Sequence, residues 1–308
     1  MIQNSGAISQ QFLTNLQLLQ QQMAATQQQI SSGTKIGQAS DAPNSVGDVL
    51  QLESDLGRVN QVTSNLNLVS GEANSAESAL QTATQMLDQV ASLAAQGVSN
   101  TVSAASRTTF SQQVGQILST LVSTSQAQFN GAYVFGGDQA SSQSYQLDFN
   151  NPNGVDRLVT TQSTRLIQDA SGITFAVSKT AQDIFDHRNP DDSLASDNIF
   201  AAVNSLRVAL ANNDQPGISA AIASIKAAQD YLAQQLAFYG GIQNQISNAL
   251  DVAQKFQLQD QTSLSQMKDT DVAAASVALT QQQASYQAAI QAESAMPRTS
   301  LFSYLSGN

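Results

Sequence analysis

The residue with the most chemical potential is His187, the single histidine of the chain, which lies between Asp186 and Arg188. One imidazole cannot build a zinc site with several histidines, and the chain has no cysteine to act as a thiolate ligand or nucleophile. A Ser–His–Asp arrangement around His187 would need a nucleophile-elbow turn and a sheet to carry it, and the sequence shows neither. We therefore expect an exposed loop histidine and no catalytic residue.

Two further groups could bind ions, and neither has the required pattern. Three neighbouring glycines lack the surrounding residues of a phosphate-binding loop: Gly131, Gly136 and Gly137. Three aspartates near Pro190 lack the glycine and the terminal glutamate of a helix-loop-helix calcium site: Asp186, Asp191 and Asp192. We expect a solvated loop at these aspartates, and we expect no metal and no cofactor.

The charge balance bears on the partners of the protein. Of 308 residues, 23 are acidic and 12 basic, which gives a net charge of −11 without any basic cluster. Nucleic-acid binding needs a basic surface, so we expect no nucleic-acid partner. Only 11% of residues are charged, and the helix surfaces are rich in Gln, Ser, Asn and Thr. This composition favours packing against copies of the chain, with an ordinary solvated surface as the alternative.

Export and membrane signals lead to two expectations. No run approaches the roughly 18 apolar residues that span a bilayer, and the apolar stripes lack the basic face of membrane-surface helices, so we expect no membrane partner. Residues 1–6 (MIQNSG) lack the basic start and apolar run of a cleaved signal peptide. The protein is expected either to stay in the cytoplasm or to be exported without a cleaved signal.

The two ends of the chain read as amphipathic helices with a heptad pattern. The first helix is expected over residues 9–31, with Gly33 as its stop and Thr26 at the one weak position of its stripe. A second stripe is expected to end near Pro297 and to be followed by a final apolar cluster. Because such stripes have no core of their own, we expect these residues to form an assembly interface: Phe12, Leu16, Leu19, Met23 and Ile30 near the N-terminus, Val272, Leu279, Tyr286 and Ile290 near the C-terminus, and Leu301, Tyr304 and Leu305 in the cluster.

The middle of the chain carries longer helical patterns. Ser40 or Asp41 followed by Pro43 reads as a helix start. Apolar residues then alternate spacings of three and four from 59 to 94, which predicts one long helix. Further helices are expected over residues 110–121, with an end near residues 129–131, over 199–210 and over 218–250, where Gly240 and Gly241 suggest a close helix contact.

Residues 138–197 change to the alternating pattern of strands. Alternation occurs over residues 145–149, 158–160 and 173–177, and the sequence Asn-Pro-Asn-Gly at 151–154 predicts a turn. The predicted fold is therefore mostly α, a long heptad-patterned helical bundle with paired N- and C-terminal helices and a small β-rich insertion domain. We expect three domains: a terminal coiled-coil assembly domain, 1–42 with 258–308; a central helical bundle, 43–137 with 198–257; and an outward-facing insertion, 138–197.

Several motifs resemble one family, the flagellins together with the flagellar hook–filament junction proteins of the hook-associated protein 3 group. Residues 27–36 (QQQISSGTKI) and 40–43 (SDAP) resemble the N-terminal signature of the family. Residues 129–137 (FNGAYVFGG) and the end of the chain at 300–305 (SLFSYL) are most similar to the junction members. Residues 239–246 (YGGIQNQI) resemble the C-terminal Gly-Ala-x-Gln-Asn-Arg motif. The resemblance covers roughly residues 1–137 and 198–305.

Some positions depart from the family pattern. The Asp-Ala-Pro at 41–43 differs from the Asp-Asp-Ala of flagellins and is closer to the junction members. In the C-terminal motif Gly241 replaces Ala and Gln245 replaces Arg, which leaves a specialised flagellin as an alternative.

The resemblance implies a non-enzymatic structural adaptor at the hook–filament junction of the bacterial flagellum, with flagellin, the filament subunit, as the runner-up. It implies a homo-oligomeric ring that contacts a neighbouring hook-associated protein on the hook side and flagellin on the filament side. It also implies an extracellular location, after export by the flagellar secretion apparatus with an export chaperone and without a cleaved signal. An enzyme carried on the insertion and a cytoplasmic coiled-coil signalling protein are the alternatives from other classes.

Overall fold

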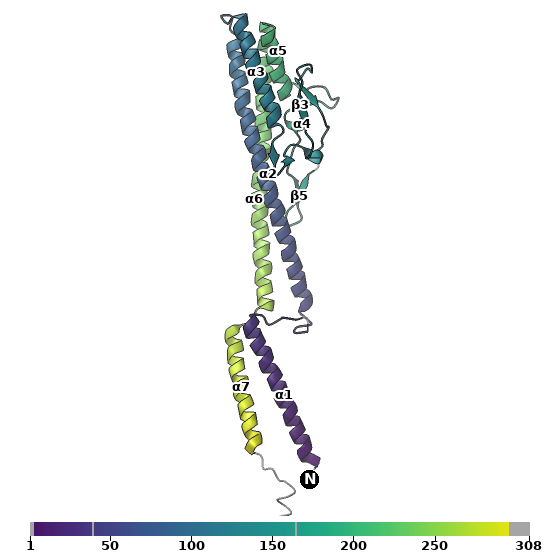
Figure 1. Cartoon of the computed structure of the whole chain (residues 1–308), viewed down its shortest axis with the longest axis vertical. Coiled ribbons are helices and arrows are strands. Elements are labelled where there is room, and N and C mark those ends of the chain that lie inside the picture. The colour runs from purple at the N-terminus through teal and green to yellow at the C-terminus, as the bar shows by residue number, and fades with distance from the viewer. Residues whose placement is uncertain (1–2, 39, 164, 296–308) are drawn as a thin grey trace, which may run out of the picture. The chain divides into compact units, whose positions relative to one another are not determined.

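The computed structural model describes residues 3–38, 40–163 and 165–295, and these form a mostly helical chain with short strand pairs (Figure 1). Two compact units can be distinguished, one made of residues 1–57 and 257–308 and the other of residues 58–256. We call them the terminal unit and the central unit. The long helices are α1 (Gln3–Ser32), α2 (Val46–Gly97), α3 (Ala104–Thr124), α5 (Ile199–Ala211), α6 (Gln215–Lys268) and α7 (Val272–Ala295), and α4 (Ala181–Ile184) is a single turn.

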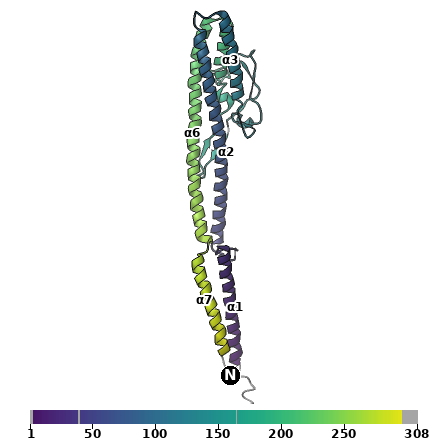
Figure 2. The same ribbon diagram turned by 60° about the vertical axis from the view of Figure 1, so that its left-hand side comes forward.

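The core of the central unit lies between α2 and α6, which run side by side in both ribbon views (Figures 1 and 2). The predicted stripe of α2 is confirmed, because every position from Val59 to Ala94 is buried except the half-buried Val62. The facing stripe of α6 alternates spacings of three and four from Ile218 to Ala253 and is also buried. Alanines in both stripes let the helix axes approach closely, so the heptad pattern is satisfied within the chain itself.

Helices α3 and α5 complete this core at one end. The buried guanidinium of Arg107 ties the α2–α3 turn together by donating to the carbonyl oxygens of Gly97 and Ser99 at 2.7 and 2.8 Å. The expected helix end near residue 131 is wrong, since α3 ends at Thr124. Residues 128–133 instead form a hairpin of β1 (Gln128–Phe129) and β2 (Ala132–Tyr133), because Asn130 and Gly131 both adopt positive φ angles that no helix can continue.

The insertion contains two further antiparallel strand pairs. In the first, β3 (Tyr145–Leu147) pairs with β4 (Val155–Arg157), and the predicted turn at 151–154 joins them. In the second, β5 (Leu166–Gln168) pairs with β6 (Thr174–Ala176). The strand expected at 158–160 is wrong, since pairing ends at Arg157, and β5 was not foreseen. A short 3₁₀ turn, η1 (Gly137–Gln139), precedes the insertion strands. Three-residue strands offer too little alternation for a reliable sequence pattern.

The loops of the terminal unit follow the expectation in part. Gly33 ends α1 with a φ of +72°, as predicted. The helix start expected at Pro43 is wrong, because α2 begins at Val46. The carboxylate of Asp41 accepts the backbone N–H groups of Gly37 and Gln38, so it closes the preceding loop and does not cap α2.

Helix α6 continues through both glycines that were expected to mark a close contact. A Cβ placed on Gly240 or Gly241 would meet no heavy atom within 4 Å outside the backbone of the helix itself, so neither glycine makes room for a neighbour. The expected division into three domains stays a prediction. The two compact units meet along the chain near residues 57 and 257.

Candidate assembly interface

Helices α1 and α7 pack against each other in the terminal unit, and we call them the terminal pair (Figure 1). The two helices run antiparallel. The amide of Gln20 donates to the hydroxyl of Tyr286 at 2.7 Å, and Thr34, just after α1, forms a β-bridge with Asp269, just before α7, so the residue number rises along one helix as it falls along the other. The pairing of the N- and C-terminal helices that the sequence predicted is therefore present within one chain.

A small set of contacts holds together the end of the terminal pair at which α1 ends and α7 begins. The backbone N–H of Lys35 donates to the carbonyl of Lys268 at 2.7 Å, and its ammonium donates to the carbonyl of Gln266 at 2.7 Å. Lys268 also forms an ion pair with Glu53 at 2.8 Å. Asp271 caps the start of α7 by accepting the N–H groups that open its first turn. These contacts stop α6 and begin α7 in a defined register.

The predicted stripe of α1 faces α7 and is covered only in part. Its members are all half-buried, as is Thr26 at the weak position: Phe12, Leu16, Leu19, Met23 and Ile30. The positions between them are exposed except for the half-buried Gln29, and the exposed positions include Leu13 at 55% and Leu18 at 53%. One partner helix therefore covers one side of this stripe and leaves apolar surface beside it.

The predicted interface residues of α7 lie in two different environments. Leu279 and Tyr286 are half-buried, whereas Val272 and Ile290 are 47% and 44% exposed, and the expected role of all four residues in an assembly interface stays a prediction. The half-buried face of α7 follows a regular heptad spacing: Ala275, Leu279, Gln282, Tyr286 and Ala289. The helix register thus places alanine and glutamine on this face beside the two large side chains. We call the half-buried faces of α1 and α7 the terminal seam.

Three predicted interface residues fall outside the described residues, and the structure does not place them: Leu301, Tyr304 and Leu305.

The terminal pair is almost free of charge. Helix α1 contains no acidic or basic residue, and α7 contains only Glu293. The side-chain oxygen of Gln282 is buried in the seam and has no hydrogen-bond partner among the described residues. Such a surface loses little solvation energy when neighbours cover it, because hardly any ion has to be dehydrated. An uncharged, partly covered heptad face is suited to burial against further helices.

The loop that was expected to be solvated is exposed at Asp191 and Asp192, but it begins at a buried polar centre around Asp186. Asp186 is fully buried and was wrongly assigned to a surface loop. Its carboxylate accepts hydrogen bonds from the following groups: the Tyr145 hydroxyl at 3.1 Å, the Asn153 and Asn198 amides at 3.0 and 2.8 Å, and the Arg188 guanidinium at 2.8 Å. Burial, and then repulsion by the Asp186 carboxylate, raises the pKa of Tyr145 well above its usual range. Asp186 thus joins β3, the turn after it and the start of α5.

His187 is placed by two neighbours and is only partly exposed. Its Nδ1 lies 2.6 Å from the Asp197 carboxylate, and its ring stacks on Tyr231 of α6 with a centroid distance of 4.6 Å. The tyrosine hydroxyl donates to the carbonyl of Asp183. His187 therefore attaches the insertion to α6, in place of the exposed loop position that was expected.

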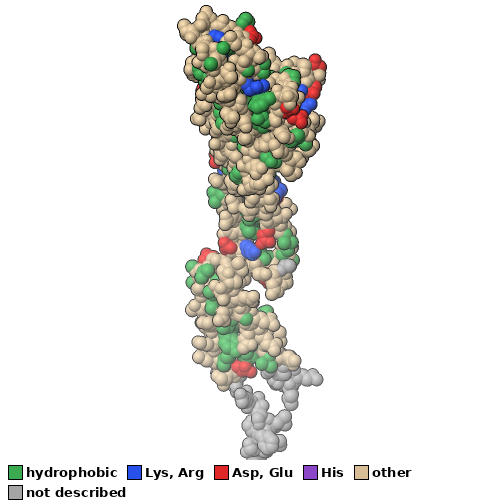
Figure 3. Space-filling view, turned by 45° about the horizontal axis from the view of Figure 1, so that its top comes forward, with side chains coloured by type: hydrophobic (Ala, Val, Ile, Leu, Met, Phe, Trp, Pro, Cys, Tyr) green, Lys and Arg blue, Asp and Glu red, His purple; other side chains and the backbone are tan. Residues whose placement is uncertain are grey.

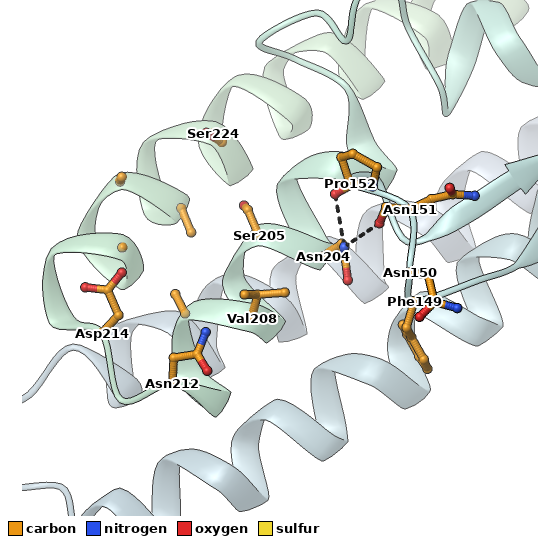
Figure 4. Close-up of a pocket in the computed structure, with 14 residues that line it drawn as sticks. Phe149, Asn150, Asn151, Pro152, Asn204, Ser205, Val208, Asn212, Asp214 and Ser224 are labelled. Atoms are coloured by element: carbon orange, nitrogen blue, oxygen red, sulfur yellow. Dashed lines mark hydrogen bonds between the residues drawn. The ribbon is translucent and has the colours of Figure 1, made fainter.

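A groove of about 590 Å³ lies in the central unit between α5, the start of α6 and the β3–β4 turn (Figure 4). The amide of Asn204 donates to the carbonyl oxygens of Asn151 and Pro152 at 3.3 and 3.0 Å, which holds the turn against α5. The rest of the lining consists of small and neutral polar side chains, the apolar Phe149 and Val208, and the carboxylate of Asp214. On the face drawn in Figure 3, neutral polar groups and backbone likewise cover most of the surface.

The part of the chain that the structure describes offers neither a metal site nor a membrane-spanning helix. There, no cluster of His, Asp or Glu could hold a metal ion, and no helix is long and apolar enough to cross a membrane.

Comparison with known proteins identifies the N-terminal part of the chain. Residues 4–140 match the family model described as the bacterial flagellin N-terminal helical region. Over this range the chain is similar to bacterial flagellins. This match spans the terminal helix α1, the α2 stripe, α3 and the β1–β2 hairpin, so the family resemblance seen in the N-terminal motifs is confirmed there. No curated protein sequence gives a significant match.

Solved structures share the fold of this chain at low sequence identity. A protein assigned as a flagellar hook-associated protein of Vibrio parahaemolyticus aligns with a TM-score of 0.64 and 17% identity, over 74% of this chain and 100% of its own. The flagellar hook-associated protein 3 of Legionella pneumophila aligns at 0.60 and 13%, over 71% and 98%. The flagellar junction protein FlgL of the same organism aligns at 0.54 and 13%, over 65% and 99%. The predicted mostly helical fold with a small β-rich insertion is thereby confirmed.

Proposed function

We propose that the protein is a structural adaptor at the hook–filament junction of the bacterial flagellum and lies in its extracellular part. The flagellin N-terminal region of residues 4–140 supports a flagellar role. The similar solved structures are described as hook-associated and junction proteins and are covered almost completely by the alignment, which favours the junction over the filament. The observation that carries the proposal is the terminal pair, whose apolar seam is only half covered within one chain.

Assembly completes the terminal seam in this proposal. A heptad face that one helix covers on one side gains stability when helices of neighbouring copies cover the other side. Each buried apolar side chain contributes about 1.5–3 kcal/mol against the entropy of ordering the helices. The result is a ring of identical subunits whose terminal pairs form an inner coiled-coil layer. The central bundle surrounds this layer, and the insertion of residues 138–197 faces outward.

The ring requires two different neighbours, a hook-associated protein on the hook side and flagellin on the filament side. Delivery to the tip of the growing structure requires export by the flagellar secretion apparatus, with an export chaperone and without a cleaved signal peptide. The adaptor acts through binding surfaces and has no enzymatic activity in this proposal, so its functional residues are those of the terminal seam.

The second candidate is a flagellin that builds the filament. The family model matched by residues 4–140 is that of flagellins, and this observation favours the candidate. The descriptions of the structural neighbours and the FNGAYVFGG motif at 129–137 weigh against it.

A charge placed in the terminal seam tests the proposal. Leu19→Asp and Leu279→Asp each put a carboxylate on a half-buried seam position, and we expect both variants to fold in the central unit but to be missing from isolated flagella. Leu166→Asp is the matched control, because Leu166 is 63% exposed on β5 in the outward-facing insertion. Incorporation is measured by immunoblotting of sheared and purified flagella. Normal incorporation of the seam variants would exclude the coiled-coil assignment.

A further inference from the structure

The chain contains two Asn-Gly pairs that lie in opposite environments, Asn130-Gly131 and Asn153-Gly154. This dipeptide can rearrange, because glycine has no side chain to hinder attack of its own backbone nitrogen on the preceding asparagine amide. The attack requires a free glycine N–H, a free asparagine side chain and room for the backbone to turn. The structure provides these conditions at one pair and removes them at the other.

The pair at 153–154 is locked. Asn153 is 3% exposed, and its amide donates to the buried Asp186 carboxylate at 3.0 Å. The N–H of Gly154 donates to the carbonyl of Asn151 at 2.9 Å. A Cβ placed on Gly154 would lie 2.7 Å from the Leu118 side chain, so the core also leaves the backbone no room to rotate.

The pair at 130–131 is open. Both residues are exposed at the tip of the β1–β2 hairpin, with φ angles of +50° and +81°. A Cβ placed on Gly131 would meet nothing within 4 Å. Each flanking strand has only two residues, so opening the turn breaks a very short ladder. Within the described residues, no hydrogen bond engages the Asn130 side chain or the Gly131 N–H.

We propose that Asn130 is a site of spontaneous deamidation to aspartate and isoaspartate, with water as the only co-reactant. The Gly131 nitrogen bonds to Cγ of Asn130, the Cγ–Nδ2 bond breaks, and ammonia leaves with the proton of the Gly131 N–H. Water then opens the cyclic imide. Cleavage at the side-chain carbonyl gives aspartate, and cleavage at the backbone carbonyl gives isoaspartate, whose main chain runs through Cγ.

Isoaspartate at position 130 would alter the β1–β2 hairpin, which packs against α2. The hairpin holds the Phe129 ring against α2 so closely that a Cβ on Gly71 would lie 2.5 Å from Phe129 Cζ. Isoaspartate adds a backbone methylene and a negative charge at the turn, which cannot keep the positive-φ geometry of Asn130 and Gly131. We expect the hairpin to loosen from α2 in the modified molecules. This inference does not depend on the proposed flagellar role.

The test follows both pairs in the same full-length protein. The folded protein is incubated in heavy-oxygen water at mildly alkaline pH, and peptide mapping by mass spectrometry measures label at each asparagine over time. We expect label at Asn130 to accumulate at least about tenfold faster than at Asn153, because the locked pair reacts only after much rarer opening. In denaturant the two rates should become similar, since both pairs share the Asn-Gly sequence.

Two results would overturn the proposal. One is an equal or faster rate at Asn153 in the folded protein. The other is absence of label at Asn130 over a period in which the denatured protein reacts fully. An isoaspartyl methyltransferase, which methylates isoaspartate alone, supplies the second readout: it should label the aged folded protein in the peptide that contains residue 130, and no such labelling would contradict the isoaspartate product.

Discussion

The central and terminal units use the same heptad spacing and reach very different degrees of burial. In the central unit the α2 stripe, from Val59 to Ala94, is closed by the α6 stripe, and most of its side chains are inaccessible to solvent. In the terminal pair no predicted seam residue is fully buried. The difference indicates that the first pattern encodes folding of the chain and that the second leaves surface for neighbouring chains.

The two units also differ in their content of basic residues. Every Lys and Arg except Lys35, Lys268 and Arg298 lies in the central unit, and several of them hold its loops in place. Arg107 fixes the α2–α3 turn, and Arg188 neutralises the buried Asp186. The terminal pair has no such ionic contacts between its own helices among the described residues, so its stability depends on apolar packing and a few polar bonds.

The largest effect is expected at the buried polar core of the central unit. Asp186→Ala leaves the Arg188 guanidinium and two amides without their acceptor, which should cost about 3–5 kcal/mol of unfolding free energy. Chemical denaturation followed by circular dichroism measures the loss. Asp191→Asn, at an exposed aspartate in the same loop, is the control and should change stability by less than about 0.5 kcal/mol. Equal effects of the two variants would mean that Asp186 is solvated.

A pair of leucine truncations tests the difference between the stripes. Leu87 is fully buried, so Leu87→Ala should cost about 2–5 kcal/mol in the monomer. Leu19 is half-buried, so Leu19→Ala should cost less than about half as much in the monomer while still weakening assembly. Denaturation of the two monomeric variants provides the comparison. A similar loss in both would show that the terminal seam is already closed within one chain.

The side-chain oxygen of Gln282, which has no hydrogen-bond partner within the described residues, offers a way to stabilise the terminal pair. Gln282→Leu removes a buried acceptor without a partner and should stabilise the terminal pair by about 1–3 kcal/mol. Hydrogen exchange of α1 and α7 in the monomer should slow accordingly, with no change in the central unit. Gln281→Leu, on the exposed neighbouring position, is the control. Faster exchange in Gln282→Leu would mean that the glutamine makes a necessary contact.

The smallest effect is expected in alkaline solution and only in the central unit. Burial, followed by the nearby Asp197 and Asp183 carboxylates, raises the pKa of Tyr231 to about 12. The unfolded chain releases this proton near pH 10, so the stabilising contribution is complete below pH 10 and is lost as the pH rises to about 12. Tyr231→Phe should flatten the fall in stability over that range. A fall of unchanged steepness would place its cause elsewhere.

The sequence predicted the long elements well and the polar contacts poorly, for a physical reason. The α2 stripe repeats over many turns, so single ambiguous residues do not alter the pattern. Asp186 has the same sequence appearance as its exposed neighbour Asp191, and only the folded positions of Tyr145, Asn153 and Asn198 show that it is buried. In α7 the sequence pattern alone did not show which of the predicted interface residues are covered within one chain, where Tyr286 is half-buried and Ile290 is exposed.

Antibody labelling tests the central claim most directly. An antibody raised against residues 138–197, the insertion, is applied to isolated flagella and located by immunogold electron microscopy. The proposed adaptor role predicts gold particles confined to the joint between hook and filament. Labelling along the whole filament would contradict that role and identify a filament subunit, and absence of label from flagella would contradict both assignments.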